Sequence, residues 1–303
     1  MPKIAITTTT FGEYDNKPVE MCRKKGFDVV LNPFGRKVRP EELVELTKDA
    51  VGLIAGTEPI TGDSLSKLPS LKVISRCGTG LDNVDLAAAK KLGIKVFNTP
   101  DAPTLAVAEL TVGLIFSLLR KIDRMDIAVR AGKWEKLMGN LVSGKKAGLI
   151  GFGRIGRKVA GLLKPLGCEI AYADPLVEAG QGGFKRLSLQ ELLSWADIVS
   201  IHVSASETII RENEIGMMKK GSWLVNASRG GVVDEGALYK ALKAKHLSGA
   251  ALDVFAKEPY EGALKELDNI ILTPHIGSYA VEARVGMEAE AVKNLLKGLD
   301  EVK

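Results

Sequence analysis

Gly151-Phe152-Gly153-Arg154-Ile155-Gly156 is the stretch that decides the fold of this 303-residue chain. It follows the apolar run at 146–150 and opens an amphipathic segment at 154–166. Gly151 permits a tight turn, Gly153 lets backbone N–H groups approach a pyrophosphate, and Gly156 lets a helix pack close to the sheet. Because glycine-rich turns are common, the pattern indicates a dinucleotide site only if its surroundings agree.

Further strands are predicted after this turn, alternating with amphipathic segments. With the strand at 146–150 they make six, the strand number of a dinucleotide-binding sheet; they lie at 169–173, 198–202, 222–226, 249–253 and 270–272.

The first third of the chain shows the same alternation. Strands are predicted at 3–8, 27–31, 52–55, 71–76 and 95–98, and helices at 19–25, 40–48 and 86–92. Such alternation implies parallel sheets covered on both faces, and the length suits two domains. We therefore expect an α/β fold with two doubly wound parallel-sheet domains.

Two helical segments complete this prediction. The segment from Thr104 to about Arg130 is apolar nearly all round, which predicts a buried helix packed between domains or subunits. Tyr279 to Lys297 predicts a closing helix. No apolar run is expected to reach the ~18 residues that span a bilayer, so no membrane partner is expected.

Composition and charge exclude several classes of function. The net charge of +5 is dispersed and aromatic residues make up only 5%, so no nucleic-acid partner is expected, although a mild positive field suits a small anionic substrate. A strand is predicted from Lys3 and no charged-then-apolar leader precedes it, so no secretion signal is expected. Cys22, Cys77 and Cys168 offer neither a disulfide framework nor metal spacing, so we expect a cytoplasmic protein without a metal.

Ligands of open parallel sheets bind beyond the carboxyl ends of the strands, and polar residues follow each predicted strand there. Asp174 follows the second strand, 18 residues beyond Gly156, near the spacing of about 20 expected for the acid that binds a ribose. A carboxylate accepts hydrogen bonds from both ribose hydroxyls and repels a 2′-phosphate, which favours NAD over NADP. The alternative is that Asp174 is a turn residue before Pro175.

Three later residues have side chains suited to redox chemistry on a keto acid. Arg229 can bind a carboxylate through its forked guanidinium, unless it is a surface arginine. His275 can donate or accept a proton near neutral pH. Glu258 could pair with His275 and raise its pKa, although a solvated loop glutamate has a similar spacing. His202 ends a strand and is expected to line the site structurally, whereas His246 has the sequence context of a surface residue.

These motifs together resemble the D-isomer-specific 2-hydroxyacid dehydrogenases over nearly the whole chain. The resemblance rests on the turn at 151–156, Val-Asn-Ala-Ser-Arg-Gly-Gly-Val-Val-Asp at 225–234, Leu-Asp-Val-Phe at 252–255 with Glu258-Pro259, and Thr-Pro-His-Ile-Gly at 273–277.

The resemblance implies a catalytic set of Arg229, Glu258 and His275. The arginine would hold the carboxylate and carbonyl of the substrate, and the histidine would be the acid/base held by the glutamate. It also implies two binding sets. NAD would be bound by Gly151, Gly153, Arg154, Ile155, Gly156, Asp174, His202, Ala227, Asp253 and Gly277. The substrate would be bound by Arg76, Gly78, Thr79, Gly80 and Arg229.

The family further implies a Rossmann cofactor domain, residues 99–275, inserted in a flavodoxin-like substrate domain, residues 1–98 and 276–303. A homodimer through the helical segment after Thr104 is also implied. Arg76 before the glycine loop and Lys136-Leu137-Met138-Gly139 resemble the branch of the family that acts on 3-phosphoglycerate.

Two departures from that branch are visible. Because the sequence ends at Lys303, the carboxy-terminal regulatory domain of many such enzymes is not expected, and Val203-Ser204-Ala205 replaces a usual proline-leucine step. Three alternatives remain open: a glyoxylate/hydroxypyruvate or other 2-ketoacid reductase, a non-catalytic NAD-sensing protein similar to corepressors in the family, and a methyltransferase-like nucleotide binder.

Overall fold

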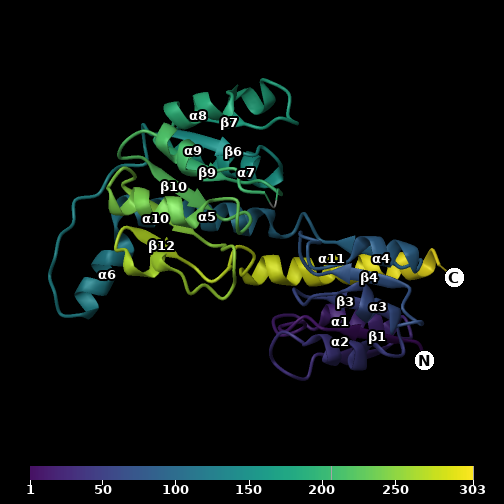
Figure 1. Cartoon of the computed structure of the whole chain (residues 1–303). Coiled ribbons are helices and arrows are strands. Elements are labelled where there is room, and N and C mark those ends of the chain that lie inside the picture. The colour runs from purple at the N-terminus through teal and green to yellow at the C-terminus, as the bar shows by residue number, and fades with distance from the viewer. Residues whose placement is uncertain (206, 303) are drawn as a thin grey trace. The chain divides into compact units, whose positions relative to one another are not determined.

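The computed structural model describes residues 1–205 and 207–302 and divides the chain into two compact units (Figure 1). One unit contains residues 1–103 and the segment from Ser278 onward, and the other contains residues 104–277. We expected the divisions at 98/99 and 275/276.

The first unit is built on a parallel sheet with the strand order β2-β1-β3-β4-β5, the order of flavodoxin-like sheets. Its strands are β1 (Lys3–Ile6), β2 (Asp28–Leu31), β3 (Ala50–Ala55), β4 (Val73–Arg76) and β5 (Lys95–Asn98). The central strands carry apolar residues on both faces, as strands between two helical layers must.

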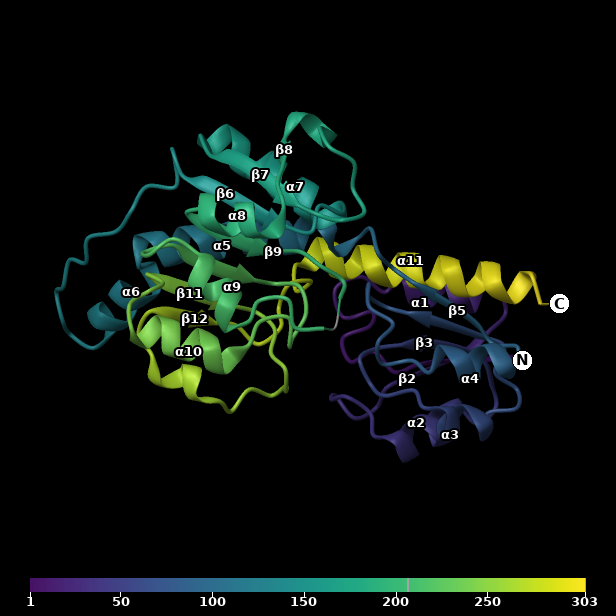
Figure 2. The same cartoon turned by 45° about the horizontal axis from the view of Figure 1, so that its top comes forward.

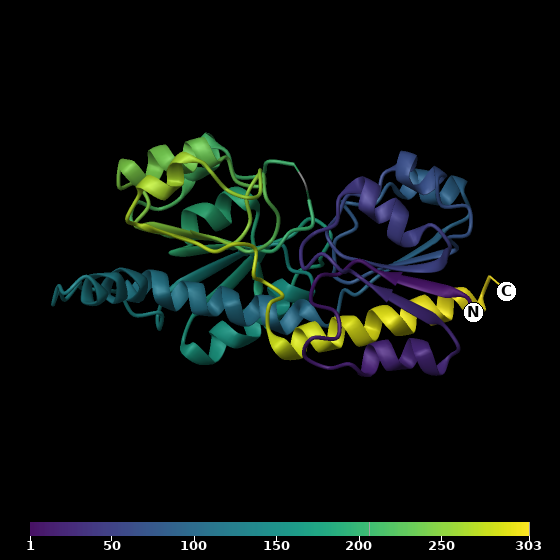
Figure 3. The ribbon, with the colours of Figure 1, turned by 90° about the horizontal axis from the view of Figure 1, so that it is seen from below.

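Two helical layers cover this sheet (Figure 3). On one face, α1 (Lys17–Lys24) and the yellow α11 (Val281–Asp300) pack against Ile4, Ile6 and Val73. On the other face lie α2 (Pro40–Thr47), α3 (Gly62–Ser66) and α4 (Leu86–Lys91). The helix α3 was not predicted, because five residues capped by Thr61 are too short to show helical periodicity.

The second unit contains a seven-stranded parallel sheet in the order β12-β11-β10-β9-β6-β7-β8, a dinucleotide-binding order with one strand added at the β12 edge. Its strands are β6 (Lys146–Ile150), β7 (Glu169–Ala173), β8 (Lys185–Arg186), β9 (Ile198–Ile201), β10 (Trp223–Asn226), β11 (Gly249–Leu252) and β12 (Ile270–Leu272). The predicted α/β class is confirmed. The strand β8 was not predicted, because its two exposed residues show no apolar pattern.

Helices again lie on both faces of this sheet (Figure 2). α8 (Leu189–Trp195), α9 (Glu212–Met217) and α10 (Glu235–Lys243) form one layer, and α5 (Pro103–Arg120) and α7 (Arg154–Leu163) form the other. Three short 3₁₀ helices, η1 (Lys164–Leu166), η2 (Gln181–Gly183) and η3 (Ala263–Glu266), extend the connections.

The prediction of one buried helix to Arg130 is wrong beyond Arg120. Lys121 adopts a left-handed conformation (φ 55°) that ends α5 and starts α6 (Ile122–Arg130), and α6 has no buried residue. The expectation that no apolar run reaches membrane-spanning length is also wrong, because α5 is long and apolar enough by length and composition. Its buried residues, such as Ile115 and Leu119, pack in the core of the second unit, and core helices commonly have this composition.

Candidate functional site

The glycine turn lies between β6 and α7, as expected, and its three glycines have different surroundings. A Cβ at Gly151 would lie 2.5 Å from the carbonyl oxygen of His202, and one at Gly156 would lie 2.3 Å from that of Gly151. A Cβ at Gly153 would meet no atom of the described residues within 4 Å. The turn is therefore closed toward the sheet and open in front of the N-terminus of α7, where backbone N–H groups favour an anion.

Asp174 joins the end of β7 to this turn. Its Oδ2 accepts the Phe152 N–H at 2.7 Å, and its Oδ1 accepts the Leu176 N–H at 2.8 Å. The carboxylate is half-buried, and each oxygen keeps further lone pairs for donors. The glycine cradle with an acceptor beside it fits the pyrophosphate and ribose of NAD.

Arg154 and Ile155 start α7, the first exposed and the second half-buried against the core. The positions of Arg154 and Ile155 are compatible with the predicted NAD contacts, which stay predictions.

His202 lies under the glycine turn and is 9% exposed. Its Nε2 lies 2.9 Å from Ser200 Oγ, and its Nδ1 has no partner among residues 1–205 and 207–302. Burial lowers the pKa of His202 to about 4, so the ring is neutral at neutral pH. Its expected structural role agrees with this position, whereas a role as acid or base near neutral pH does not.

The segment after β10 is held in a tight turn by Asn226. The side chain of this buried residue donates to the Arg229 carbonyl at 3.0 Å and accepts from the N–H and hydroxyl of Ser228 at 3.0 and 2.7 Å. A Cβ at Gly230 would lie 1.8 Å from the Phe255 carbonyl oxygen. The turn that carries Arg229 therefore packs directly on the segment that leads to Glu258.

Arg229 itself is half-buried, and its Nη1 donates to the Ser228 carbonyl at 2.9 Å. Ala227, a predicted cofactor contact, is 8% exposed in the same turn. Asn226 lies within one of the sequence motifs, but no role was predicted for it. The Asn-Ala-Ser sequence was a usable signal, because asparagine side chains commonly close turns by binding the backbone two residues on.

His275 and Glu258 meet although they come from different loops. The Nδ1 of His275 lies 2.9 Å from Glu258 Oε2, and Glu258 Oε1 accepts the Phe255 N–H at 3.1 Å. A carboxylate neighbour requires the proton on Nδ1, so Nε2 is the nitrogen available to a ligand. Because the side chains of His275 and Glu258 are 53% and 39% exposed, a molecule in solution can reach the pair.

Asp253 holds the turn around His275. His275 has a φ of 54°, which is unusual for a residue other than glycine. Asp253 is 1% exposed and accepts hydrogen bonds from the Thr273 hydroxyl at 2.6 Å and from the N–H groups of Ile276 and Gly277, each at 2.8 Å. Burial raises the pKa of Asp253, and these hydrogen bonds partly offset the effect.

These contacts give Asp253 a positioning role that the sequence did not reveal. The predicted contacts of Asp253 and Gly277 with the cofactor stay predictions.

The predicted substrate loop lies in the other unit, after β4. The N–H of Gly78 donates to the buried Thr99 Oγ1 at 2.7 Å, and the Thr79 carbonyl accepts from Asn98 Nδ2 at 2.7 Å. Arg76 bends back over this loop: its Nη1 donates to the Cys77 carbonyl at 2.9 Å and would lie 1.2 Å from a Cβ at residue 78. The guanidinium therefore takes the place of a side chain at Gly78 and stiffens the loop that ends at Gly80.

A buried carboxyl group that was not predicted as a site residue lies beside this loop. Glu58, 2% exposed after β3, accepts hydrogen bonds from the Thr7 hydroxyl and from the Gly56 N–H at 3.1 Å. Asn83 Nδ2 donates to the Glu58 carbonyl at 2.6 Å and links the two loops. These contacts hold the loops after β3 and β4 together at the carboxyl edge of the sheet.

Comparison with known proteins agrees with this arrangement. Residues 112–277 match the family model described as "D-isomer specific 2-hydroxyacid dehydrogenase, NAD binding domain". A D-3-phosphoglycerate dehydrogenase of Pongo abelii is 40% identical over 254 residues, 80% of this chain and 48% of the relative. A hydroxypyruvate reductase of Thermotoga maritima is 38% identical over 269 residues, 86% of this chain and 88% of the relative.

A solved structure of a Thermus thermophilus protein has a TM-score of 0.90 and 34% identity, covering 99% of this chain and 97% of its own. The chain spans about half the length of the phosphoglycerate dehydrogenases that it matches. Sequence motifs, strand order and these comparisons agree that the chain belongs to the D-isomer-specific 2-hydroxyacid dehydrogenase family and contains the NAD-binding domain of that family.

Proposed function

We propose that this chain is an NAD-dependent oxidoreductase that interconverts a small D-2-hydroxy acid and the corresponding 2-keto acid. The observation that carries this proposal is the 2.9 Å contact between His275 Nδ1 and Glu258 Oε2, beside a turn locked by Asp253. An imidazole oriented by a carboxylate is the acid–base arrangement that such a reaction requires at the substrate oxygen.

Each residue of the candidate site has a separate role in this reaction. NAD, when bound, supplies the hydride chemistry at C2 of the substrate. His275 donates a proton from Nε2 to the C2 oxygen during reduction and accepts it during oxidation. Glu258 keeps the proton on Nδ1 and stabilises the imidazole when both nitrogens are protonated. Arg229 orients the substrate carboxylate and polarises the carbonyl oxygen, because its forked donors suit both groups.

Our first substrate assignment is the pair of 3-phosphoglycerate and 3-phosphohydroxypyruvate, which would place the chain in serine biosynthesis. The phosphoglycerate dehydrogenases among its relatives support this assignment. The Gly78 N–H already donates to Thr99 Oγ1, so the N–H groups of Thr79 and Gly80 in this loop would bind the substrate carboxylate, and Arg76 would bind the phosphate.

The second candidate is reduction of hydroxypyruvate, glyoxylate or another 2-keto acid. The Thermotoga maritima relative, which this chain covers almost to its full length, favours it. The third candidate is a non-catalytic NAD sensor. The pairing of His275 with Glu258 is evidence against it, because sensing alone does not require an oriented imidazole.

One experiment distinguishes these three candidate functions. Turnover of a panel of D-2-hydroxy acids and 2-keto acids is followed by NADH absorbance, with NADPH alongside, for the unmodified chain and for Arg76→Ala and His275→Ala. Activity on 3-phosphohydroxypyruvate that falls far more in Arg76→Ala than activity on glyoxylate supports the phosphorylated substrate, and equal losses rule it out. If His275→Ala turns over as fast as the unmodified chain and binds NAD equally well, the acid–base proposal is wrong.

We also propose that the protein is a cytoplasmic homodimer. Large apolar side chains that globular cores normally bury are exposed on α5, α6 and the segment that follows them: Leu105, Ile122, Ile127, Trp134, Met138 and Leu141. A second copy of the chain would cover them. Sedimentation at several protein concentrations tests this, and a monomer throughout would contradict it.

A further inference from the structure

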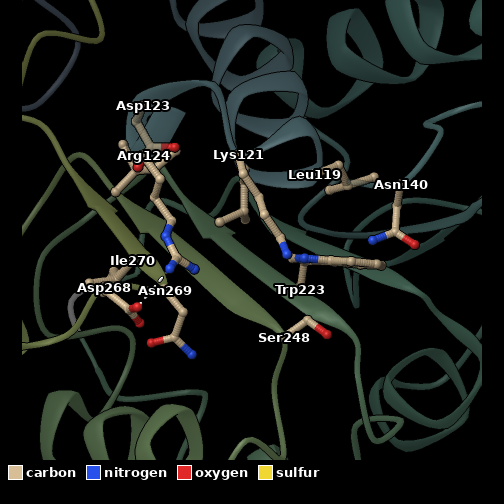
Figure 4. A pocket seen from close by; sticks show the side chains of 12 residues that line it. Leu119, Lys121, Asp123, Arg124, Asn140, Trp223, Ser248, Asp268, Asn269 and Ile270 are labelled. Atoms are coloured by element: carbon tan, nitrogen blue, oxygen red, sulfur yellow. Dashed lines mark hydrogen bonds and ion pairs between the residues drawn. The ribbon is translucent and has the colours of Figure 1, made fainter. Parts of the chain in front are cut away.

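The cavity in Figure 4 lies in the 104–277 unit, at the amino ends of β10, β11 and β12. It has a volume of about 120 Å³, and Lys121 and Trp223 are among the residues that line it. The α5–α6 junction forms one wall, and the homodimer proposed above would bring a second copy of the chain against this region. Ligands of parallel sheets bind at the carboxyl ends of the strands, so a further substrate contact is expected at the carboxyl edge of the other sheet.

Three loops lie side by side at that edge, because β1, β3 and β4 are neighbours in the order β2-β1-β3-β4-β5. Thr8 follows β1, Glu58 follows β3, and the loop that contains Thr79 and Gly80 follows β4. Asn83 Nδ2 donates to the Glu58 carbonyl at 2.6 Å and so joins the second loop to the third. Side chains of these loops can therefore act on one ligand.

Gly56 leaves room between the first two loops. A Cβ at Gly56 would lie 2.9 Å from Glu58 Oε2 and 3.8 Å from Thr8 Oγ1. The carboxylate oxygen and the threonine hydroxyl therefore lie beside the same point, and a side chain at residue 56 would displace the carboxylate.

The two polar atoms beside this point keep hydrogen-bonding capacity. Glu58 Oε1 accepts from the Thr7 hydroxyl and the Gly56 N–H, whereas Oε2 accepts no hydrogen bond from residues 1–205 and 207–302. Oε2 is not among the fully buried polar atoms of these residues, so a ligand can reach it. Thr8 Oγ1 is fully buried and has no partner in the same ranges. Because a buried hydroxyl without a partner is unfavourable, Thr8 indicates that a polar group is missing at this point.

A hydroxyl group fits this pair of atoms better than a charged substituent does. It can donate its hydrogen to the Glu58 carboxylate and accept one from Thr8 at the same time. An ammonium group can only donate, and a phosphate group is repelled by the carboxylate. The pair therefore suits a substrate that carries a hydroxyl group here.

The spacing of the loops agrees with a three-carbon substrate. In the part of the chain that the structure describes, the N–H groups of Thr79 and Gly80 donate to no acceptor, so they are available to a substrate carboxylate. Adjacent strands lie about 4.8 Å apart, and the carboxylate oxygens of a three-carbon acid lie about 4–5 Å from its C3 oxygen. A substrate bound through its carboxylate to the loop after β4 can therefore extend its C3 substituent to Glu58.

We propose that Glu58 and Thr8 form a specificity subsite that binds a hydroxyl group on C3 of the substrate. Glu58 Oε2 accepts the hydrogen bond of this hydroxyl group, and Thr8 Oγ1 donates to its oxygen. The inference rests on the proposed oxidoreductase function. Within that function it favours the second substrate candidate, hydroxypyruvate, over the phosphorylated acid.

The test compares the reduction of three 2-keto acids by NADH. Pyruvate lacks the C3 hydroxyl group of hydroxypyruvate, and 3-phosphohydroxypyruvate carries a phosphate group in its place. We expect kcat/KM of the unmodified chain to be at least about ten-fold higher for hydroxypyruvate than for either of the others. The physical reason is that pyruvate leaves polar atoms of the subsite without a partner, and the phosphate group is repelled.

Two variants remove one polar atom each. Glu58→Gln should lower the ratio of kcat/KM for hydroxypyruvate to that for pyruvate about ten-fold, as expected for a lost hydrogen bond to a charged group. It should also raise kcat/KM for 3-phosphohydroxypyruvate relative to hydroxypyruvate, because the repelling charge is gone. Thr8→Val keeps the shape of the side chain and should lower the hydroxypyruvate-to-pyruvate ratio about three-fold or more.

The matched control is Thr47→Val. Thr47 Oγ1 is also buried without a partner among the described residues, but Thr47 ends α2 and precedes the amino end of β3. The six-residue strand β3 spans about 20 Å, which separates Thr47 from the carboxyl edge. This variant should keep the ratio of the unmodified chain.

The possible failures are distinguishable. An unchanged hydroxypyruvate-to-pyruvate ratio in Glu58→Gln and Thr8→Val would overturn the subsite and leave the proposed function intact. A preference of the unmodified chain for 3-phosphohydroxypyruvate would overturn it as well and would support the first substrate assignment. If the unmodified chain reduces no 2-keto acid, the proposed function is wrong and the subsite is wrong with it. If circular dichroism shows that Glu58→Gln does not fold, Thr8→Val decides alone, because its loss breaks no hydrogen bond within the described chain.

Discussion

Acidification should destabilise the 104–277 unit through His202, and the size of the effect follows from its burial. The ring has an ordinary pKa of 6.5, which burial lowers to about 4 in the folded chain. Between these values the unfolded chain takes up a proton that the folded chain does not, so this contribution is fully present above pH 6.5 and is lost as the pH falls toward 4.

The difference between the two pKa values corresponds to about 3.4 kcal/mol of unfolding free energy. About 2 kcal/mol of this should be lost between a pH of about 7.5 and a pH of about 5. Protonation would also place an unpaired charge under the glycine turn, because the His202 carbonyl and Cβ pack against Gly151 and Gly156. NAD affinity should therefore fall over the same range.

The assay is urea unfolding at several pH values, followed by tryptophan fluorescence. Trp134, Trp195 and Trp223 all lie in the 104–277 unit, so the signal follows the unit that contains His202. Over this pH range, the unfolding free energy of His202→Asn should fall by about 2 kcal/mol less than that of the unmodified chain, whatever the stability of the variant at neutral pH.

The control is His246→Asn, which removes a half-buried histidine whose ring contacts the Ile215 carbonyl at 3.0 Å and leaves His202 in place. The unfolding free energy of this variant should decrease as the pH falls, by as much as that of the unmodified chain. An identical pH dependence in His202→Asn and the unmodified chain would refute the assignment of the effect to His202.

Three further predictions concern the candidate site. Glu258→Gln keeps the size of the side chain but removes its charge, so kcat should fall about ten-fold or more with NAD affinity unchanged, and an unaltered kcat in stopped-flow assays would contradict the pairing. Asp174→Asn should shift the ratio of NAD to NADP affinities about ten-fold toward NADP, as measured by calorimetry; a constant ratio would show that the carboxylate does not select the cofactor. Gly156→Ala should weaken NAD binding and destabilise the fold by about 1–3 kcal/mol, because its Cβ would lie 2.3 Å from the Gly151 carbonyl oxygen. Gly161→Ala in the same helix meets no described atom within 4 Å and should stabilise by about 0.5–1 kcal/mol; similar melting temperatures for the two variants would disprove the close packing.

The sequence alone was sufficient to predict the parts of the structure that depend on local patterns of residues. Alternating apolar runs and amphipathic segments predict a parallel α/β sheet, because each strand and each helix has its own period of burial. The glycine turn at 151–156 and its distance to Asp174 are likewise local, since one strand, one helix and the next strand suffice to place them.

Short or interrupted elements were missed for the same reason. β8 has two residues and α3 has five, so neither repeats its burial pattern often enough to be recognised. The break at Lys121 was not foreseen, because lysine gives no local sign of a left-handed conformation.

Only the tertiary structure decided which side chains meet. Glu258 and His275 are separated by 17 residues, and their contact depends on β11 and β12 being neighbours in register. The same pairing lets Asp253 bind Thr273, Ile276 and Gly277. The depressed pKa of His202 and the cavity lined by Lys121 and Trp223 likewise require elements distant in sequence to pack together. A sequence pattern reports which face of an element is buried, but hydrogen-bond partners are set by strand order, register and packing, which no single segment contains.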